Sequence, residues 1–357
     1  VKTTSNSQRI PEFITYNGIV RSCPQDQGEL FNKFFYEQFS DESSYNIGID
    51  WADDSSFDIN FCHRKVRKLL SKINSNKACG PDGIHGKILK NCAVSLAYPL
   101  SLMYTISYNT GCIPKEWKLG HIVPVHKKGS KENIENYRPI SLTSLVMKTF
   151  ERILKDEILL RTSHLLDNRQ HGFLSQKSCT TNMAGFCDSL ALSLNDCMRT
   201  DVVYFDLSKA FDYVNHDLIL WKLKNIYKID GRLLKFLISY LSEREQCVAI
   251  GNAKSSLKPV LSGVPQGSIL GPILFVLFIN DLPEGISSDT NLALYADDTK
   301  IWRTINSDHD ILQKDITYLH EWAMRNKMNF HPQKCKVVSV SHNLPPLLGI
   351  LPNIQYY

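Results

Sequence analysis

The chain has 357 residues, enough to bury a large hydrophobic core and to form two or three domains. A composition of 43% hydrophobic and 22% charged residues is that of a globular protein and excludes an intrinsically disordered one. The 41 Lys and Arg residues outnumber the 36 Asp and Glu residues, and the resulting net charge of +5 is compatible with an anionic partner but too small to establish one.

The ten cysteines contain no Cys-x-x-Cys pair and no neighbouring histidine cluster, so a zinc site has little support. The even count permits disulfides, but a chain of this size can stabilise itself by burial, and no signal peptide is visible. We therefore expect reduced thiols in an intracellular protein. The longest apolar run, residues 269–279, is too short to cross a membrane and predicts a buried helix, so no membrane partner is expected.

Residues 1–60 are predicted to be weakly organised, with one short helix around residues 30–35. Basic, amphipathic residues 64–73 then predict a helix that ends before a turn at residues 80–83. Further helices are expected at residues 85–92, 94–108, 145–160, 180–199, 216–227, 231–243, 269–280 and 309–327. Extended segments are expected at residues 120–129, 137–142, 201–206, 292–296 and 299–303, and on both sides of residues 251–252. Because helices and strands are intermingled, the fold class is α+β with a mainly antiparallel sheet.

Two acidic motifs follow apolar strands. Residues 203–205 end at Asp206, and Asp297 and Asp298 occupy the tip of a tight hairpin between apolar strands. Two adjacent like charges are unfavourable unless a cation lies beside them, and Mg²⁺ prefers a few carboxylate oxygens together with substrate phosphates. If the two strands are neighbours, Asp206 and Asp297 would hold two metal ions for in-line phosphoryl transfer. Taken singly, each motif is more often a capping residue or a polar turn.

Six segments occur together in a characteristic order. They are residues 113–118, 137–142, 170–173, 205–212, 263–268 and 295–298. Over about residues 75–340 this ordered set resembles the reverse transcriptases of non-LTR, LINE-like retrotransposons, nearest the jockey type. Residues 205–212, 263–268 and 295–298 are similar to polymerase motifs A, B and C, whereas the three upstream segments are similar to finger motifs and the motif that follows them.

The resemblance implies a right-hand polymerase fold with fingers and a palm. The expected parts are a linker-like segment at 1–75, fingers at 76–200, a palm at 201–340 and the start of a truncated thumb at 341–357, with a reverse transcriptase domain covering about 105–357 overall. An endonuclease domain is expected to precede this chain in the full-length protein.

The resemblance also implies the metal ligands. Asp206 and Asp297 would hold two Mg²⁺ ions, with Mn²⁺ as a possible substitute, and Asp298 would lie closer to the periphery. The carbonyl oxygen of Leu207 is an expected additional ligand.

Two residues are expected to contact the sugar or the template. Phe211 would exclude a ribose 2′-hydroxyl and so select deoxynucleotides; the alternative is a core phenylalanine at the start of a helix, and the two roles do not exclude each other. Gln266, in a loop made permissive by Gly263 and Gly267, would hydrogen-bond the template or the incoming sugar. A glycine-rich turn alone is most often only a turn.

Basic residues are expected at the triphosphate. Arg138 would clamp it, with help from Lys127 or Lys128, through charge-assisted hydrogen bonds. Either lysine could instead belong to a solvated turn. Lys334 is favoured over Lys336 as the group that protonates the leaving pyrophosphate.

The implied function is RNA-directed DNA polymerisation in retrotransposon mobilisation. The expected partners are an RNA template, a DNA primer or nicked target DNA, and deoxynucleoside triphosphates, and the expected locations are cytoplasm and nucleus. A viral RNA-dependent RNA polymerase is a rival, but such enzymes usually have an acid where Phe211 stands and a glycine where Ala296 stands. A second alternative is a truncated or domesticated element that binds nucleic acid without catalysis.

Overall fold

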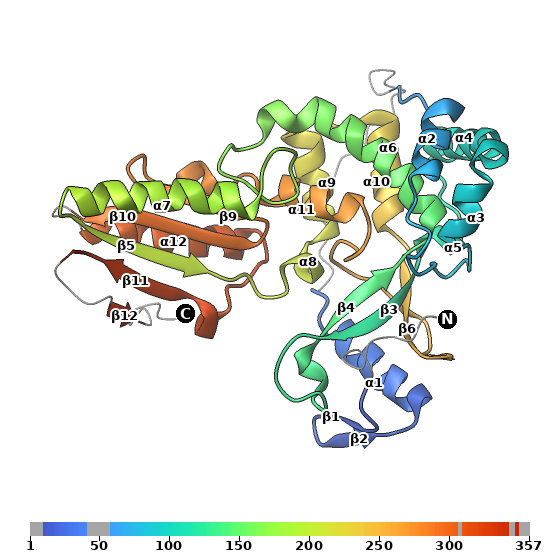
Figure 1. Cartoon of the computed structure of the whole chain (residues 1–357), viewed down its shortest axis with the longest axis horizontal. Coiled ribbons are helices and arrows are strands. Elements are labelled where there is room, and N and C mark those ends of the chain that lie inside the picture. The colour runs from blue at the N-terminus through green and yellow to red at the C-terminus, as the bar shows by residue number, and fades with distance from the viewer. Residues whose placement is uncertain (1–9, 41–57, 306–308, 343–346, 350–357) are drawn as a thin grey trace. The chain divides into compact units, whose positions relative to one another are not determined.

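The structure is a computed structural model that describes residues 10–40, 58–305, 309–342 and 347–349 (Figure 1). The chain forms two compact units, and each is made of two separate stretches of sequence. The first unit comprises Val1–Arg161 and His216–Gly271, and the second comprises Thr162–Asn215 and Pro272–Tyr357. The predicted fingers and palm are continuous ranges, whereas these units are interleaved, so the predicted ranges remain predictions.

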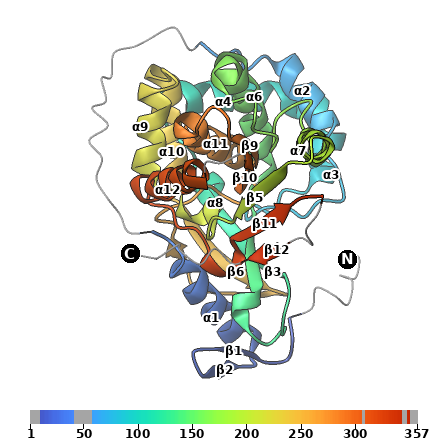
Figure 2. The ribbon, with the colours of Figure 1, turned by 90° about the vertical axis from the view of Figure 1, so that its left-hand side faces the viewer.

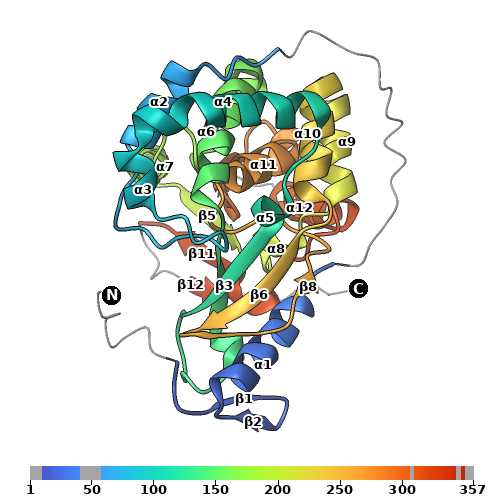
Figure 3. The same ribbon diagram turned by 90° about the vertical axis from the view of Figure 1, so that its right-hand side faces the viewer.

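The first unit contains a mixed sheet. Its strands, in order, are β4 (Tyr137–Leu142), β3 (Leu119–His126), β6 (Glu245–Ile250) and β7 (Ala253–Lys254), and β8 (Lys258–Pro259) also pairs with β6. β3 and β6 run parallel and lie side by side in Figure 3, whereas the other pairs are antiparallel. The helices of this unit are α1 (Pro24–Tyr36), α2 (His63–Ser71), α3 (Gly86–Asn91), α4 (Ala93–Thr110), α5 (Lys115–Lys118), α9 (His216–Asn225), α10 (Gly231–Leu241) and nearly all of α6 (Leu145–Thr162).

The expectation of weak organisation near the N-terminus is wrong for residues 10–39. A hairpin of β1 (Ile14–Tyr16) and β2 (Ile19–Arg21) turns at Asn17 and Gly18, which both have positive φ, and α1 follows it. Phe31 and Phe35 on α1 are buried against the sheet, because their spacing places them on one face of a helix. The rest of the first 60 residues, apart from Ser40 and residues 58–60, lies outside the described residues.

The second unit contains an entirely antiparallel sheet. Its strands, in order, are β12 (Leu347–Gly349), β11 (Lys336–Val340), β5 (Arg199–Phe205), β10 (Asp298–Ile305) and β9 (Asn291–Tyr295). The helices α7 (Cys179–Asn195) and α12 (His309–Arg325) cover opposite faces of this sheet (Figures 1 and 2). On the α7 face Phe186 packs edge-on against Trp302, with a ring-centroid distance of 5.0 Å. The predicted α+β class with a mainly antiparallel sheet is therefore confirmed.

Two further helices belong to the core of the second unit or lead into it. The predicted apolar helix is α11 (Leu270–Ile279), and the short helix α8 (Ala210–Tyr213) follows β5. Every residue of α11 except Pro272 is buried. Short 3-10 turns are found at Ile134–Asn136, Ser163–Leu165, Leu282–Gly285 and Pro332–Lys334. All ten cysteines are free thiols, and no helix in the described ranges is both long and apolar enough to span a membrane.

Candidate active site

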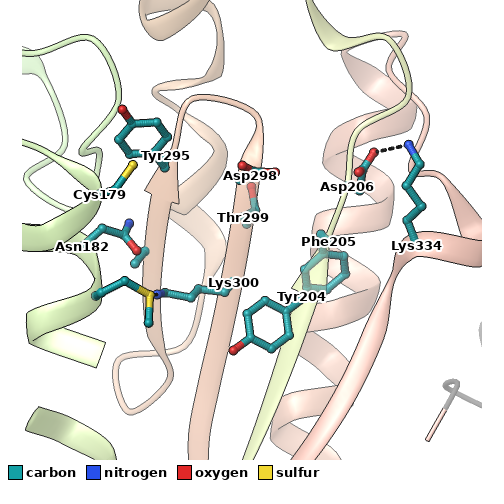
Figure 4. Close-up of a pocket in the computed structure, with 12 residues that line it drawn as sticks. Cys179, Asn182, Tyr204, Phe205, Asp206, Tyr295, Asp298, Thr299, Lys300 and Lys334 are labelled. Atoms are coloured by element: carbon teal, nitrogen blue, oxygen red, sulfur yellow. Dashed lines mark hydrogen bonds and ion pairs between the residues drawn. The ribbon is translucent and has the colours of Figure 1, made fainter. Parts of the chain in front are cut away.

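The two acidic motifs lie on neighbouring strands. β5 pairs with β10 so that Phe205 faces Thr299 across the ladder. One residue further toward the same end of each strand stand Asp206 and Asp298 (Figure 4). This register meets the condition for a shared metal site that was set from the sequence, namely that the two acidic strands are neighbours.

Strand alternation sets which way each side chain points. Phe205 is 4% exposed and packs against Phe330, so the preceding Tyr204 and the following Asp206 face the other side of the sheet. That side holds a cavity of about 360 Å³, whose lining includes Asp206 and Asp298. Lys300 from β10 and residues in the N-terminal turn of α7 also line the cavity. Its lining therefore combines charged and apolar side chains.

Lys334 meets the first carboxylate. Its Nζ lies 3.1 Å from Asp206 Oδ1, and both side chains are about one third exposed, at 35% and 34% (Figure 4). The backbone places the lysine there, because the N–H of His331 donates to the Asp206 carbonyl over 2.7 Å and the N–H of Ser208 donates to the Asn329 carbonyl over 2.7 Å. Lys336, the other candidate, is exposed and does not line the cavity.

The same backbone bridge bears on the predicted carbonyl ligand. Leu207 stands opposite Phe330 in an isolated antiparallel bridge, and the flanking hydrogen bonds use the Asp206 carbonyl and the Ser208 N–H. Neither of these two hydrogen bonds uses the Leu207 carbonyl oxygen. An additional metal ligand at this position requires that.

The carboxylate hairpin has a two-residue turn. Asp298 pairs with Tyr295, so Ala296 and Asp297 are the central turn residues. Ala296 has a φ of 57°, at the turn position that usually takes glycine. Asp298 is exposed and lines the cavity, whereas Asp297 is half-buried at the turn and does not appear in the lining. The predicted order of importance of these two acids remains a prediction.

The donor set fits a hard divalent cation by type, because carboxylate and carbonyl oxygens are the ligands that Mg²⁺ prefers. Within the described part of the chain, however, no three His, Cys, Asp or Glu side chains lie close enough to hold a metal ion. Asp206 is instead paired with the ammonium of Lys334. The carboxylates share one end of two strands without forming a closed ligand shell.

Phe211 is held by two other rings. It lies on α8, and its ring stacks on that of Phe275 at a centroid distance of 4.5 Å and an interplanar angle of 18°. Phe173 meets it edge-on at 6.0 Å. Both the core role and the gating role considered for Phe211 are compatible with this arrangement.

The remaining predicted residues belong to the first unit and are described within it. Arg138 on β4 is exposed and pairs with Val125, one hairpin turn away from the exposed residues Lys127 and Lys128. The carbonyl of Gln266 accepts a hydrogen bond of 2.8 Å from the N–H of Ser141, three residues beyond Arg138. The loop that contains Gln266 is therefore hydrogen-bonded to β4, the strand that carries Arg138.

That loop is anchored by a buried acid for which the sequence analysis assigned no role. Glu151 on α6 is 1% exposed, and its Oε2 accepts hydrogen bonds from the backbone N–H groups of Ile269 at 2.5 Å and Leu270 at 3.3 Å. The hydroxyl of Tyr240 donates to its Oε1 at 3.1 Å. Burial raises the pKa of Glu151 above its ordinary value, despite these hydrogen bonds and the nearby Arg244. In the sequence, this buried acid could have been recognised as a glutamate within an otherwise apolar face of the predicted helix.

Lys300 is another buried charged residue to which no role was assigned from the sequence. It is 6% exposed, and its Nζ lies 4.2 Å from the centroid of the Phe186 ring and 3.6 Å from the Met183 sulfur. Burial lowers the pKa of Lys300. The signal was a lysine in an apolar strand two residues after Asp298.

The comparisons with known proteins identify the family. The family described as reverse transcriptase (RNA-dependent DNA polymerase) matches residues 125–350, well over half of the chain. The chain belongs to the reverse transcriptase family. This family generally uses a divalent metal ion and acts on a nucleic acid template and primer. The resemblance to reverse transcriptases of non-LTR elements is thereby confirmed, and the predicted enzyme class is that of the family.

Individual relatives come from mobile elements. The chain is 29% identical to a probable RNA-directed DNA polymerase from transposon BS of Drosophila melanogaster, over 85% of this chain and 35% of that protein. It is 27% identical to the RNA-directed DNA polymerase from mobile element jockey of the same species, over 80% of this chain and 32% of that protein. The chain therefore spans about a third of the length of these relatives.

A solved structure of apo telomerase from Candida tropicalis, truncated from its C-terminal domain, is also similar. The TM-score is 0.49 at 16% identity, covering 70% of this chain and 56% of that one.

Proposed function

We propose that this chain carries the nucleotidyl-transfer centre of an RNA-directed DNA polymerase of a jockey-type retrotransposon. It would add deoxynucleotides to a primer 3′-hydroxyl on an RNA template. The observation that carries the proposal is the β5–β10 register, which sets Asp206 and Asp298 at one end of adjacent strands with Lys334 in contact.

The carboxylates are proposed to hold two Mg²⁺ ions. Asp206, Asp297 and Asp298, with the Leu207 carbonyl, supply oxygen ligands of the right type, and Mn²⁺ would be accepted by the same set. When bound, such a pair of ions activates the attacking hydroxyl and neutralises the leaving pyrophosphate. The ammonium of Lys334 lies beside Asp206, and its proposed role is to give a proton to the leaving group.

The nucleotide is proposed to be held by groups of different chemistry. Arg138, Lys127 and Lys128 offer exposed cationic donors for the triphosphate, and guanidinium matches phosphate geometry in a bidentate way. Phe211 would face the sugar, and Gln266 would contact the sugar or the template.

The natural context is proposed from the relatives' names. An RNA template and a DNA primer or nicked target DNA would be copied during mobilisation of the element, between cytoplasm and nucleus. The full-length protein would include an endonuclease domain. The alternative is a domesticated element that binds nucleic acid without synthesis, and the metal requirement separates the two.

Asp297→Asn tests the proposal. The variant should lose primer extension while it still binds a primed RNA template, because a neutral amide of the same size removes the metal-binding charge. Asp289→Asn is a matched control, since Asp289 is an exposed acid just before β9 that pairs with Arg303. Parallel loss of binding and synthesis in Asp297→Asn would indicate a folding role instead.

A further inference from the structure

A short segment extends the sheet of the second unit beyond β9. The N–H of His171 donates to the Leu294 carbonyl over 2.8 Å, and the N–H of Leu294 donates to the Arg169 carbonyl over 3.0 Å. Gln170 and Leu294 accordingly form an isolated parallel bridge. The segment therefore lies alongside the strand that leads into the carboxylate hairpin.

The side chain of Gln170 reaches the turn itself. Its Oε1 accepts a hydrogen bond from the N–H of Ala296 at 3.0 Å and another from the N–H of Gly172 at 2.7 Å. The side chain is 1% exposed. A single buried amide oxygen thus connects residues 170–172 to the first residue of the turn that presents Asp297.

The backbone approach at this point is close. A Cβ atom on Gly172 would stand 2.4 Å from the nitrogen of Ala296, a distance that real Cβ contacts do not show. Since the φ of Gly172 is not in the left-handed region, the requirement for glycine there comes from the neighbouring turn rather than from its own conformation. Residues 170 and 172 therefore contact the turn by two independent means.

The turn needs such support. An alanine with a φ of 57° is in a strained backbone conformation, which persists only where its surroundings hold it. A buried hydrogen bond stabilises by an amount comparable to this strain. If the bond is lost, relaxation of the turn would move Asp297, and a displacement of about 1 Å can cost about 10²-fold in rate.

We propose that Gln170 is a positioning residue for the metal-binding carboxylates: its amide oxygen fixes the Ala296–Asp297 turn through the Ala296 N–H. The effect of Gln170 on DNA synthesis rests on the proposed function. The hydrogen bond and its effect on metal binding can be measured without synthesis.

The test compares Gln170→Met, which keeps the length but removes the acceptor, with Gln170→Glu, which keeps an acceptor oxygen. Ser189→Ala is the matched control, because it removes the hydroxyl that accepts a 2.9 Å hydrogen bond from the indole N–H of Trp302, which lies on the same sheet away from the turn. Three readouts are needed: hydrogen exchange of the Ala296 amide, Mn²⁺ affinity by electron paramagnetic resonance, and single-nucleotide incorporation with separate kcat and KM.

We expect Gln170→Met to lose protection of the Ala296 amide, to bind Mn²⁺ about tenfold more weakly, and to lower kcat by about 10- to 100-fold with little change in KM for the primed template. Gln170→Glu should recover part of each loss. Ser189→Ala should lower the melting temperature about as much as Gln170→Met does, but it should leave the Ala296 exchange, the Mn²⁺ affinity and kcat unchanged.

An unchanged Mn²⁺ affinity and an unchanged Ala296 exchange rate in Gln170→Met would overturn the proposal. So would a loss in Gln170→Met that only follows the folded fraction, as in Ser189→Ala. If wild-type protein binds Mn²⁺ but makes no DNA, the proposed function fails, whereas the exchange and Mn²⁺ readouts still decide the role of Gln170.

Discussion

Phe211→Val is the most informative change for substrate choice. The phenylalanine ring is fixed between Phe275, on which it stacks at 4.5 Å, and Phe173, which meets it edge-on at 6.0 Å. A ring held on two sides cannot turn away when a ribose 2′-hydroxyl approaches. Valine removes the ring and leaves room for the hydroxyl, so ribonucleotides should be incorporated.

The size of the effect follows from packing energies. Forcing extra atoms against a well-packed group costs about 1–3 kcal/mol. At about 1.4 kcal/mol per factor of ten, the ratio of kcat/KM for deoxynucleotides to that for ribonucleotides should fall by about 5- to 150-fold. The lost aromatic contacts, worth about 0.5–1.5 kcal/mol for each pair, should also lower the melting temperature by several degrees.

The assay is single-nucleotide addition with matched deoxy- and ribonucleoside triphosphates. Phe186→Leu is the control, because Phe186 packs against Trp302 in the same unit and should cost stability without changing the ratio. A folded Phe211→Val variant with unchanged sugar selectivity would refute the assignment and leave Phe211 as a core residue.

Two further predictions concern buried and paired charges. The pKa of Glu151 is raised in the folded chain, so this carboxyl stays protonated in the folded state at pH values where it ionises in the unfolded state. The unfolding free energy of the wild type should therefore fall, relative to that of Glu151→Gln, as the pH rises above the ordinary glutamate pKa of about 4.5. Urea melts over a pH series measure this difference, and a difference that grows in favour of the wild type would contradict it. Lys334→Gln removes the ammonium 3.1 Å from Asp206 and should slow incorporation by about 10²-fold or more without weakening primer-template binding, as measured by rapid-quench kinetics and fluorescence anisotropy. Wild-type rates in this variant would exclude Lys334 as the proton donor.

Local patterns in the sequence predicted the elements that carry the carboxylates. Apolar runs ending in Asp206 and at Asp297 indicated strands at 201–206, 292–296 and 299–303, and these became β5, β9 and β10 with modest shifts at their ends. Apolar periodicity is set by burial on one face, so it survives in the folded chain. The two-metal interpretation required β5 and β10 to be neighbours, and the register meets that condition.

Other features depend on contacts between distant residues, and local patterns do not contain them. The hydrogen bond of Gln170 to Ala296 joins positions 126 residues apart. β11 and β12 were not predicted. They are only five and three residues long, and β11 pairs with β5 while β12 pairs with β11. The placement of Asp298 rather than Asp297 in the cavity lining likewise follows from strand register and from the turn at Ala296.

The central claim is that Asp206 belongs to a metal-dependent centre for DNA synthesis. The most direct measurement is deoxynucleotide incorporation on a primed RNA template with Mg²⁺ or Mn²⁺, in the wild type and in Asp206→Ala. We predict incorporation that requires the metal ion and disappears in Asp206→Ala while the primed template remains bound. Metal-independent incorporation, or equal incorporation by Asp206→Ala, would contradict the account.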